Sequence, residues 1–361
     1  TVDDIDCVAT NDFKQEFFGN EYLVDNFIIQ GREIKCYIIS HHLAHCASAY
    51  YTSPFNEAHC FSMDCSMGKL EANSLVAYGK GKKLFAEYCP GEMVGVLYGE
   101  VTEKLGLGPA LHKAGTTMGL SSYGTPFDFD YQSYTDDIKH KMDVAASVQN
   151  LFENKVLSVL NDVDQNSDNL CLSGGSFLNC NANSEVVRKS KFKQFHHFPA
   201  CGDDGTAVGS ALYVSHHILG EARYDYEPQD ICYTGRDYPS QTPDYNHIAR
   251  QIADGKIIGW FQGKSEFGPR ALGNRSILAD PRNFHNRDLI NHVVKNREWF
   301  RPFAPVVLEE CYQDWFDFPI PSPYMLYTAQ VKQPEKVPAI THVDGSARFQ
   351  TVTEKSNKHY Y

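Results

Sequence analysis

The sequence predicts an α/β protein with two domains, on three observations. It has 361 residues, of which 42% are hydrophobic and 22% charged, as in a soluble globular protein large enough for two cores. Through about the first 220 residues, short β-rich apolar runs alternate with segments of helical periodicity, which is typical of α/β folds. A polar, proline-containing stretch at 221–243 then precedes a second mixed region. We place the domain boundary inside that stretch.

Each expected element follows from a local pattern. Apolar runs and turn signals predict a strand at 33–40, a helix over "HHLAHCASAYY", a strand at 59–64, a hairpin at 74–88, and helices at 93–105 and 142–160. The first helix should end near Pro54, because proline cannot continue a helix, and "GKGKK" supplies the turn of the hairpin. Farther on, "NLCLSGGSFLNCNANSEVV" and "QFHHFPACGDDGTAVGSALYVSHHIL" each predict strand, glycine turn and helix. The second region should contain a helix in "DYNHIARQIADG" and strands in "KIIGWFQG", "FAPVVLEE" and "ARFQTVTE".

Charge and hydropathy exclude several classes of partner. The formal net charge is −12, and an acidic chain without a broad basic surface repels nucleic acid. No apolar run approaches the roughly 20 residues that span a bilayer, and the first residues are acidic, unlike a secretory signal. We therefore expect a cytoplasmic protein with no membrane partner, and the sequence leaves its oligomeric state open.

The cysteines indicate a reducing environment. There are 11 of them, an odd number, without a CxxC pair, which fits neither a disulfide framework nor a zinc knuckle. We interpret them as small, reduced hydrophobic residues. Those in apolar segments should be buried: Cys36, Cys46, Cys60, Cys171, Cys180 and Cys232.

Two histidines and several carboxylates form a candidate metal site. His41 and His45 are four residues apart in an expected helix and so share one face, although such pairs are also common at surfaces and in packing. Asp64 ends an apolar strand, and Asp203 and Asp204 lie in a glycine-flanked turn before a helix. Mixed nitrogen and oxygen donors suit iron, manganese or zinc. Asp204 fits a helix N-cap equally well.

A glycine turn is a candidate phosphate-binding element. Ser173, Gly174 and Gly175 lie between a short strand and a helix. Such a turn brings backbone N–H groups close to a phosphate, and the helix N-terminus adds a favourable dipole. The motif is neither a Walker motif nor a GxGxxG fingerprint, so a simple turn is the alternative.

The strongest signal is a cluster of cations in the second region. Lys264 to Arg301 holds four acids and eight basic residues, namely Lys264, Arg270, Arg275, Arg282, Arg287, Lys295, Arg297 and Arg301. Arginine binds phosphate and carboxylate through its planar fork, and the glycines and prolines of "FGPRALG" hold Arg270 on a shaped loop. We predict a site for a small phosphate-bearing ligand; a solvated surface is the alternative.

Six motifs together resemble the ATP-dependent O-carbamoyltransferases of the nodulation-factor and tobramycin type. In chain order they are "SHHLAHCASAYYTSPF", "GGSFLNCNANSEV", "CGDDGTAVGSAL", "IIGWFQGKSEFGPRALGNRSILADPR", "WFRPFAPVV" and "HVDGSARFQTV". The resemblance covers nearly the whole chain. It implies a kinase-like domain of the actin/sugar-kinase/Hsp70 superfamily at 1–228 and a YrdC-like α/β domain at 229–361. We expect the first domain to lack its first strands and the second to be incomplete at its C-terminal end.

The resemblance implies a reaction in two steps. The YrdC-like domain would join carbamoyl phosphate to ATP, giving carbamoyl-adenylate and pyrophosphate, and the kinase-like domain would pass the carbamoyl group to a hydroxyl of a small-molecule acceptor. Mg²⁺ is expected with ATP, and iron, or else zinc or manganese, in the kinase-like domain. The alternatives are a tRNA threonylcarbamoyl-type modifier, which the acidic balance disfavours, and an inactive nucleotide- or metal-binding module.

The resemblance also implies roles for particular residues of this chain. The implied metal ligands are His41, His45, Asp64 and Asp204. Arg270 and Arg275, together with Asp204, are implied to be catalytic. The residues implied to bind nucleotide or carbamoyl phosphate are Gly174, Gly175, Asn179, Lys295, Arg301 and Arg348.

Overall fold

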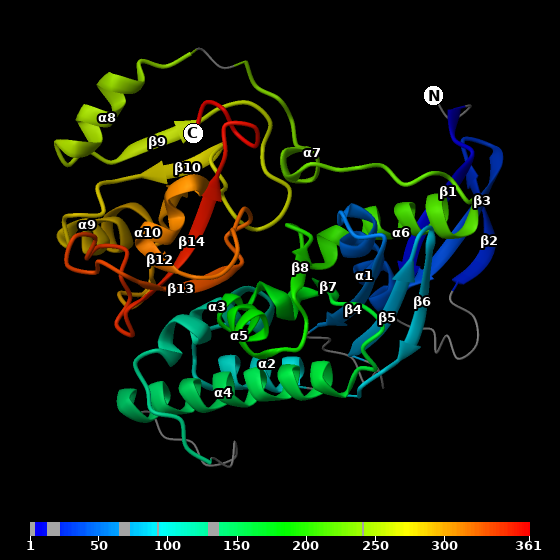
Figure 1. Cartoon of the computed structure of the whole chain (residues 1–361), viewed down its shortest axis with the longest axis horizontal. Helices are drawn as coiled ribbons and strands as arrows, with labels where there is room; N and C mark the ends of the chain where they lie inside the picture. The colour runs from blue at the N-terminus through cyan, green and yellow to red at the C-terminus, as the bar shows by residue number, and fades with distance from the viewer. Residues whose placement is uncertain (1–3, 13–21, 65–72, 92–93, 129–136, 240–241) are drawn as a thin grey trace. The chain divides into compact units, whose positions relative to one another are not determined.

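The computed structural model in Figure 1 describes residues 4–12, 22–64, 73–91, 94–128, 137–239 and 242–361. It confirms a mixed α/β protein, whose contacts divide the chain into two compact units. The first unit comprises Thr1–Leu97, Asn154–Leu178 and Val186–Tyr226, and the second Tyr98–Glu153, Asn179–Glu185 and Glu227–Tyr361. The second unit thus takes two segments that lie between parts of the first unit in the sequence. The kinase-like and YrdC-like domains, with their boundary after residue 228, stay predictions.

The first unit is built on two sheets. The larger has the strand order β6-β5-β4-β7-β8, in which β4, β7 and β8 are parallel. Its strands are β4 (Glu57–Met63), β5 (Ser74–Lys80), β6 (Lys83–Tyr88), β7 (Asn169–Ser173) and β8 (Gln194–His197). The smaller has the order β1-β3-β2 and consists of β1 (Cys7–Asp12), β2 (Tyr22–Ile29) and β3 (Arg32–Ser40). We did not predict β1 and β2, whose residues are half-buried or exposed and whose apolar runs are short.

Helix α1 (His41–Thr52) follows β3 directly and is buried along its whole length. It packs on β4, on β7 and on α6 (Thr206–Leu212), which continues as a π-helical turn over Tyr213–Ile218. A Cβ on Gly209 of α6 would collide with the carbonyl oxygen of Ala44. This glycine therefore permits close contact between the two helices and draws the turn before α6 toward the first turns of α1.

Two buried histidines make the first unit sensitive to acid. His59 on β4 and His197 on β8 are 1% and 3% exposed. Burial lowers the pKa of His59 to about 4 and that of His197 to about 3, so both stay neutral in the folded protein. The unfolded chain takes up these protons below a pH of about 6.5. Their contribution to stability is therefore present above about pH 6.5 and is lost as the pH falls toward the folded-state pKa values.

We expect each of these histidines to lower the free energy of unfolding by about 2 kcal/mol between pH 7 and pH 5. Denaturant titrations at the two pH values measure the change. A variant that cannot take up the proton, His197→Leu, should lose its share of this pH dependence. A pH dependence equal to that of the wild type would contradict the assignment.

The second unit combines a four-stranded sheet with a two-stranded ribbon. The sheet has the order β11-β14-β13-β12, with β11 (Val306–Leu308), β12 (Phe316–Asp317), β13 (Tyr327–Val331) and β14 (Ser346–Val352). The antiparallel ribbon pairs β9 (Ile258–Phe261) with β10 (Arg275–Leu278), and the loop between them carries "FGPRALG". Its helices are α3 (Ala110–Ser121), α7 (Pro228–Cys232), α8 (Tyr245–Ala253), α9 (His285–Leu289), a π-helical turn at Ile290–Val294 and α10 (Tyr312–Trp315).

Three further helices have residues in both units, namely α2 (Val94–Lys104), α4 (Ile138–Asp162) and α5 (Cys180–Lys189). The predicted strands, hairpin and helices are confirmed to within a few residues at their ends, with residue 93 outside the described ranges. All six cysteines predicted to be buried are buried and free; Cys65 lies outside the described residues. Within those residues, no helix combines the length and the apolar character that crossing a lipid bilayer requires.

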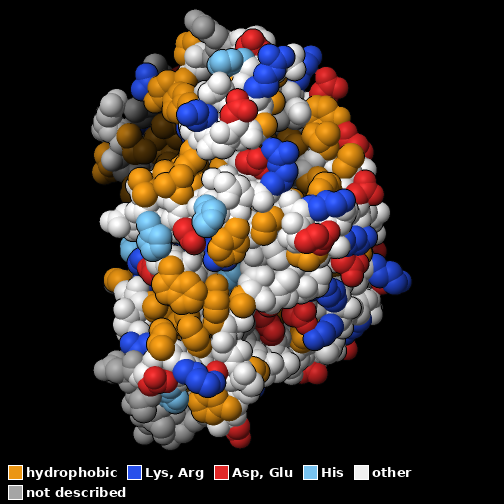
Figure 2. Space-filling model, turned by 90° about the vertical axis from the view of Figure 1, so that its left-hand side faces the viewer, with side chains coloured by type: hydrophobic (Ala, Val, Ile, Leu, Met, Phe, Trp, Pro, Cys, Tyr) orange, Lys and Arg blue, Asp and Glu red, His pale blue; other side chains and the backbone are white. Residues whose placement is uncertain are grey.

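The distribution of charged side chains on one face of the protein is relevant to nucleic-acid binding. In Figure 2, basic and acidic side chains are interspersed, and hydrophobic side chains gather in several groups between them. The described residues on that face form no broad basic surface of the kind that binds a nucleic-acid backbone.

Candidate functional site

Four side chains of the first unit converge on one point. His41 and His45 from α1, Asp64 from the end of β4 and Asp203 from the turn before α6 each offer one ligand atom, and these atoms lie within 4.8 Å of one another. The Nε2 atom of His45 is 3.1 Å from Nε2 of His41 and 3.2 Å from Oδ2 of Asp64. Oδ1 of Asp203 is 3.5 Å from both Nε2 atoms. Two imidazole nitrogens therefore face two carboxylate oxygens.

The ends of regular elements bring these residues together. Because α1 begins at His41, the two histidines occupy successive turns on one face of the helix. Asp64 follows the last residue of β4. Gly174 has a φ of +97°, and a Cβ on it would collide with the carbonyl oxygen of Met63, while a Cβ on Gly175 would lie 2.7 Å from Oδ1 of Asp64. The predicted glycine turn therefore packs against the candidate metal ligand; its role in nucleotide binding stays a prediction.

Electrostatics favour a cation at this point. Burial alone would lower the pKa of His45, but hydrogen bonds with the Asp203 and Asp64 carboxylates outweigh it and raise that pKa. Burial alone would raise the pKa of Asp64, but its hydrogen bonds with His41 and His45 hold it well below its usual range. The same two histidines lower the pKa of Asp203. Both carboxylates are thus ionised, and positive charge between them is stabilised.

The donor set fits a transition-metal ion. Two buried imidazoles and two carboxylates form a mixed nitrogen and oxygen site, which suits iron, manganese or zinc better than calcium. The ionised carboxylate of Asp64, which is largely removed from water, needs a positive partner. His41, His45, Asp64 and Asp203 are the residues that would hold the ion.

Asp203 takes the place that we predicted for Asp204. The two residues open a 3₁₀ turn after Gly202, where successive side chains point about a third of a turn apart. Only the first is directed at the histidines. The carboxyl of Asp204 lies against the backbone N–H groups of residues 204 and 205, and burial raises its pKa. The structure does not bring Asp204 into the cluster, so its predicted metal and catalytic roles find no support in the geometry.

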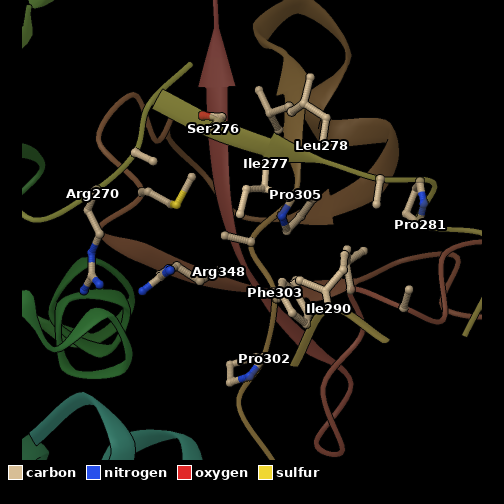
Figure 3. A pocket seen from close by; sticks show the side chains of 18 of the residues that line it. Arg270, Ser276, Ile277, Leu278, Pro281, Ile290, Pro302, Phe303, Pro305 and Arg348 are labelled. Carbon is tan, nitrogen blue, oxygen red and sulfur yellow. The ribbon is translucent and has the colours of Figure 1, made fainter. Parts of the chain in front are cut away.

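The second unit contains a cavity of about 1360 Å³. Seven Lys or Arg residues line it, namely Arg270, Arg287, Lys295, Arg297, Arg301, Arg348 and Lys358. Figure 3 shows Arg270, from the loop between β9 and β10, and Arg348, from β14, extending their guanidinium groups toward the same space. Ile277, Ile290 and Phe303 contribute apolar wall. Convergent charged groups in a partly apolar cavity are typical of a small-ligand site.

The cations of this cavity repel one another. Burial lowers the pKa of Lys295, and the nearby arginines lower it further. Burial, with Arg301 and Arg348, lowers the pKa of Arg297 to about 10. Burial also lowers the pKa of Arg301, which Glu298 partly offsets. An anion bound among these side chains would relieve the repulsion.

Arg297 and Arg301 are held in place by their neighbours. Nε of Arg297 donates to Oδ1 of Asn291 at 2.7 Å, and its guanidinium lies 4.6 Å from the ring centroid of Phe303. Nη1 of Arg301 donates to Oγ1 of Thr116 at 2.7 Å. Fixed cations bind an anion without ordering themselves first. Arg297 belongs to the predicted cationic cluster, but we predicted no role for it, although its spacing with Lys295 and Arg301 was the available signal.

Arg275 lies outside this cavity. Its guanidinium donates to the carbonyl groups of Gln262, Gly263 and Asn274 and lies 3.8 Å from the ring centroid of Phe261. It is not among the residues that line the cavity. Three hydrogen bonds to backbone carbonyls thus hold Arg275 at the β9–β10 ribbon, and its catalytic role stays a prediction.

Asn179 also has local partners. Its Oδ1 accepts a hydrogen bond from the backbone N–H of Ala182 at 3.1 Å, near the start of α5. Its side-chain amide exchanges two hydrogen bonds with that of Gln149, at 3.0 and 3.1 Å. These contacts fix the first turn of α5, and the predicted nucleotide contact of Asn179 stays a prediction.

Comparison with known proteins decides the family. The family model described as Carbamoyltransferase N-terminus matches residues 10–138 and 127–212, and that described as Carbamoyltransferase C-terminus matches residues 249–361. The chain belongs to the carbamoyltransferase family. The N-terminal match contains His41, His45, Asp64 and Asp203, and the C-terminal match contains all seven Lys and Arg residues of the cavity.

The chain is similar to several carbamoyltransferase-family relatives over most of its length. It is 34% identical to nodulation protein NolNO of Sinorhizobium fredii over 90% of this chain and 55% of that protein. It is 33% identical to nodulation protein NolO of Bradyrhizobium diazoefficiens over 90% of this chain and 69% of that protein. A 3'-hydroxymethylcephem-O-carbamoyltransferase of Streptomyces clavuligerus is 29% identical over 91% of this chain and 70% of that protein. The chain thus spans roughly half to two thirds of the curated relatives it matches.

Proposed function

We propose that this chain acts in the transfer of a carbamoyl group to a hydroxyl of a small-molecule acceptor. Membership of the carbamoyltransferase family supports the group transferred. The observation that carries the proposal is the gathering of seven Lys or Arg side chains around one cavity in a chain of net charge −12. Such a cluster of cations destabilises the folded protein while no anion is bound, and it is favourable when anionic substrates occupy the cavity.

The substrates of the second unit would be carbamoyl phosphate and ATP, the latter with Mg²⁺. Water releases phosphate from carbamoyl phosphate, and an oxygen of the resulting carbamate attacks the α-phosphorus of ATP. The bond between the α-phosphorus and the oxygen bridging it to the β-phosphate breaks, which leaves carbamoyl-adenylate and pyrophosphate. Arg270, Arg301 and Arg348 would offset the repulsion between the substrates and the charge that develops on the phosphoryl oxygens.

The transfer step belongs to the first unit in this proposal. The acceptor hydroxyl attacks the carbamoyl carbon, its proton leaves, and AMP is released. A metal ion held by His41, His45, Asp64 and Asp203 would supply Lewis-acid polarisation of the carbonyl group or a hold on the nucleotide phosphates. Gly174 and Gly175 would leave the backbone beside Asp64 open to the approach of a phosphate.

The acceptor class is inferred from the relatives. The printed name of one of them, 3'-hydroxymethylcephem-O-carbamoyltransferase, specifies an alcohol on a small molecule. We infer the same class for this chain. The net charge of −12 disfavours tRNA.

Pyrophosphate release tests the first half-reaction. We expect the chain, supplied with Mg²⁺, to release pyrophosphate only when ATP and carbamoyl phosphate are both present, because carbamate is the nucleophile. Reactions that lack either substrate are the controls. Pyrophosphate release that is indifferent to carbamoyl phosphate would contradict the proposal.

A further inference from the structure

Asn11, near the end of β1, connects two parts of the metal cluster. Its Oδ1 lies 3.0 Å from Nδ1 of His41, and its Nδ2 donates to Oγ1 of Thr206 at 2.9 Å. Oγ1 of Thr206 in turn donates to the backbone carbonyl of Asp203 at 2.7 Å. The side chain of Asn11 therefore bridges α1, which carries both histidines, and the turn that carries Asp203.

The donor and the acceptor in each of these three hydrogen bonds follow from the bond between Thr206 and Asp203. The hydroxyl of Thr206 has a single hydrogen, which the carbonyl of Asp203 accepts, so Oγ1 accepts from the NH₂ group of Asn11. The amide of Asn11 is thereby oriented with its oxygen toward His41. An amide oxygen only accepts, so Nδ1 of His41 carries the proton. The lone pair of the imidazole then lies on Nε2, the atom that faces the other ligands.

We propose that Asn11 is a positioning residue for the metal centre, which holds His41 in the Nδ1–H tautomer with Nε2 directed at the ion. The inference rests on the proposed metal site. Outer-shell partners of this kind orient an imidazole and increase its basicity as a ligand. The other histidine differs, because Nδ1 of His45 is buried and has no hydrogen-bond partner among the described residues. Orientation by a side-chain amide is thus confined to one of the two imidazoles.

If Asn11 tied β1 to α1 for packing alone, the expected results would be different. Such a tie would change the thermal stability of the protein but not its affinity for a metal. A positioning role changes the affinity even when stability is kept. Leucine and aspartate have nearly the shape of asparagine, but only aspartate retains an oxygen that can accept from Nδ1–H. The two substitutions therefore separate shape from hydrogen bonding.

The experiment measures Co²⁺ dissociation constants by chelator competition, together with the visible spectrum of the bound ion. We expect Asn11→Leu to weaken Co²⁺ binding by about 10–100-fold and to alter the spectrum. Asn11→Asp should bind within a few-fold of the wild type. Asn26→Leu is the matched control, because Asn26 is exposed on β2 of the same sheet, and it should leave the affinity unchanged.

The outcomes separate this inference from the proposed site. A wild-type protein that binds no Co²⁺ would overturn the metal site and the role of Asn11 together. Wild-type binding that Asn11→Leu preserves, with the same spectrum, would overturn only the role of Asn11. Should Asn11→Leu fail to fold, Thr206→Val provides the same decision, since it removes the group that orients the amide. Unchanged affinity in Thr206→Val would then overturn the positioning role.

Discussion

Arg348→Met should lower the rate of pyrophosphate release from ATP and carbamoyl phosphate by about 10²–10³-fold, the usual cost of removing one donor from a site that stabilises developing negative charge. Arg348 extends from β14 toward the space that Arg270 also reaches (Figure 3). Its Nε is buried and has no hydrogen-bond partner among the described residues, which leaves that donor for a ligand. Methionine keeps an apolar stem of similar length and removes the charge. Initial rates at saturating substrate measure the effect.

The matched control is Arg250→Met. Arg250 is exposed on α8 and is not among the residues that line the cavity, so its removal should change the rate by less than twofold. Thermal unfolding supplies a second comparison. Arg348 contributes to the lowered pKa of Lys295 and of Arg297, so Arg348→Met should be at least as stable as the wild type. Equal losses of rate in Arg348→Met and Arg250→Met would refute a specific role for Arg348.

His45→Ala should abolish high-affinity metal binding and carbamoyl transfer while leaving pyrophosphate release intact. His45 is fully buried, and its Nε2 faces both His41 and Asp64. Losing a ligand should cost more than the roughly 10–100-fold that outer-shell changes cost, and it leaves two carboxylates facing each other with less compensation. Metal content after dialysis and transfer to a hydroxyl acceptor, measured beside pyrophosphate release, separate the two half-reactions.

The control for this prediction lies in the same turn of α1. Nδ1 of His42 bonds with Oγ of Ser62 at 3.0 Å, and His42 is not part of the four-residue cluster. Since the asparagine amide can replace an Nδ1 contact, His42→Asn should retain metal and transfer activity. Metal binding at wild-type strength in His45→Ala would show that the ion is bound elsewhere.

Many of the regular elements and most chemistry-bearing segments of this chain could be predicted from local pattern. The helical spacing of His41 and His45 and the apolar strand before Asp64 were sufficient to place three of the four side chains that the structure brings together. The choice between Asp203 and Asp204 could not be predicted from local pattern. Adjacent side chains in a tight turn differ only in the direction in which they point, and tertiary packing sets that direction. The close contact between α6 and α1 at Gly209 is part of that packing, and no local pattern encodes it.

The arginines of the second region also show what local sequence could and could not predict. Composition located the cationic segment, because a bidentate donor on a glycine- and proline-rich loop is a local property. Composition could not distinguish Arg297 from Arg275. Arg297 lines the cavity, whereas Arg275 donates hydrogen bonds to backbone carbonyls at the ribbon. That difference depends on which strand pairs with which. Asn11 was missed because β1 is short and half-buried, so nothing in its sequence marked a strand.

The wide separation of the clustered ligands along the chain gives a bound ion a second effect. His45 and Asp64 are 19 residues apart, and Asp203 lies in a far later segment, so an ion held by all three would cross-link distant parts of the polypeptide. Such a cross-link exists only in the folded chain, and it stabilises that state in proportion to the logarithm of free metal over its dissociation constant. Metal starvation would therefore shorten the lifetime of the protein against proteolysis as well as slow its turnover, and a fall in protein abundance would be its first cellular sign.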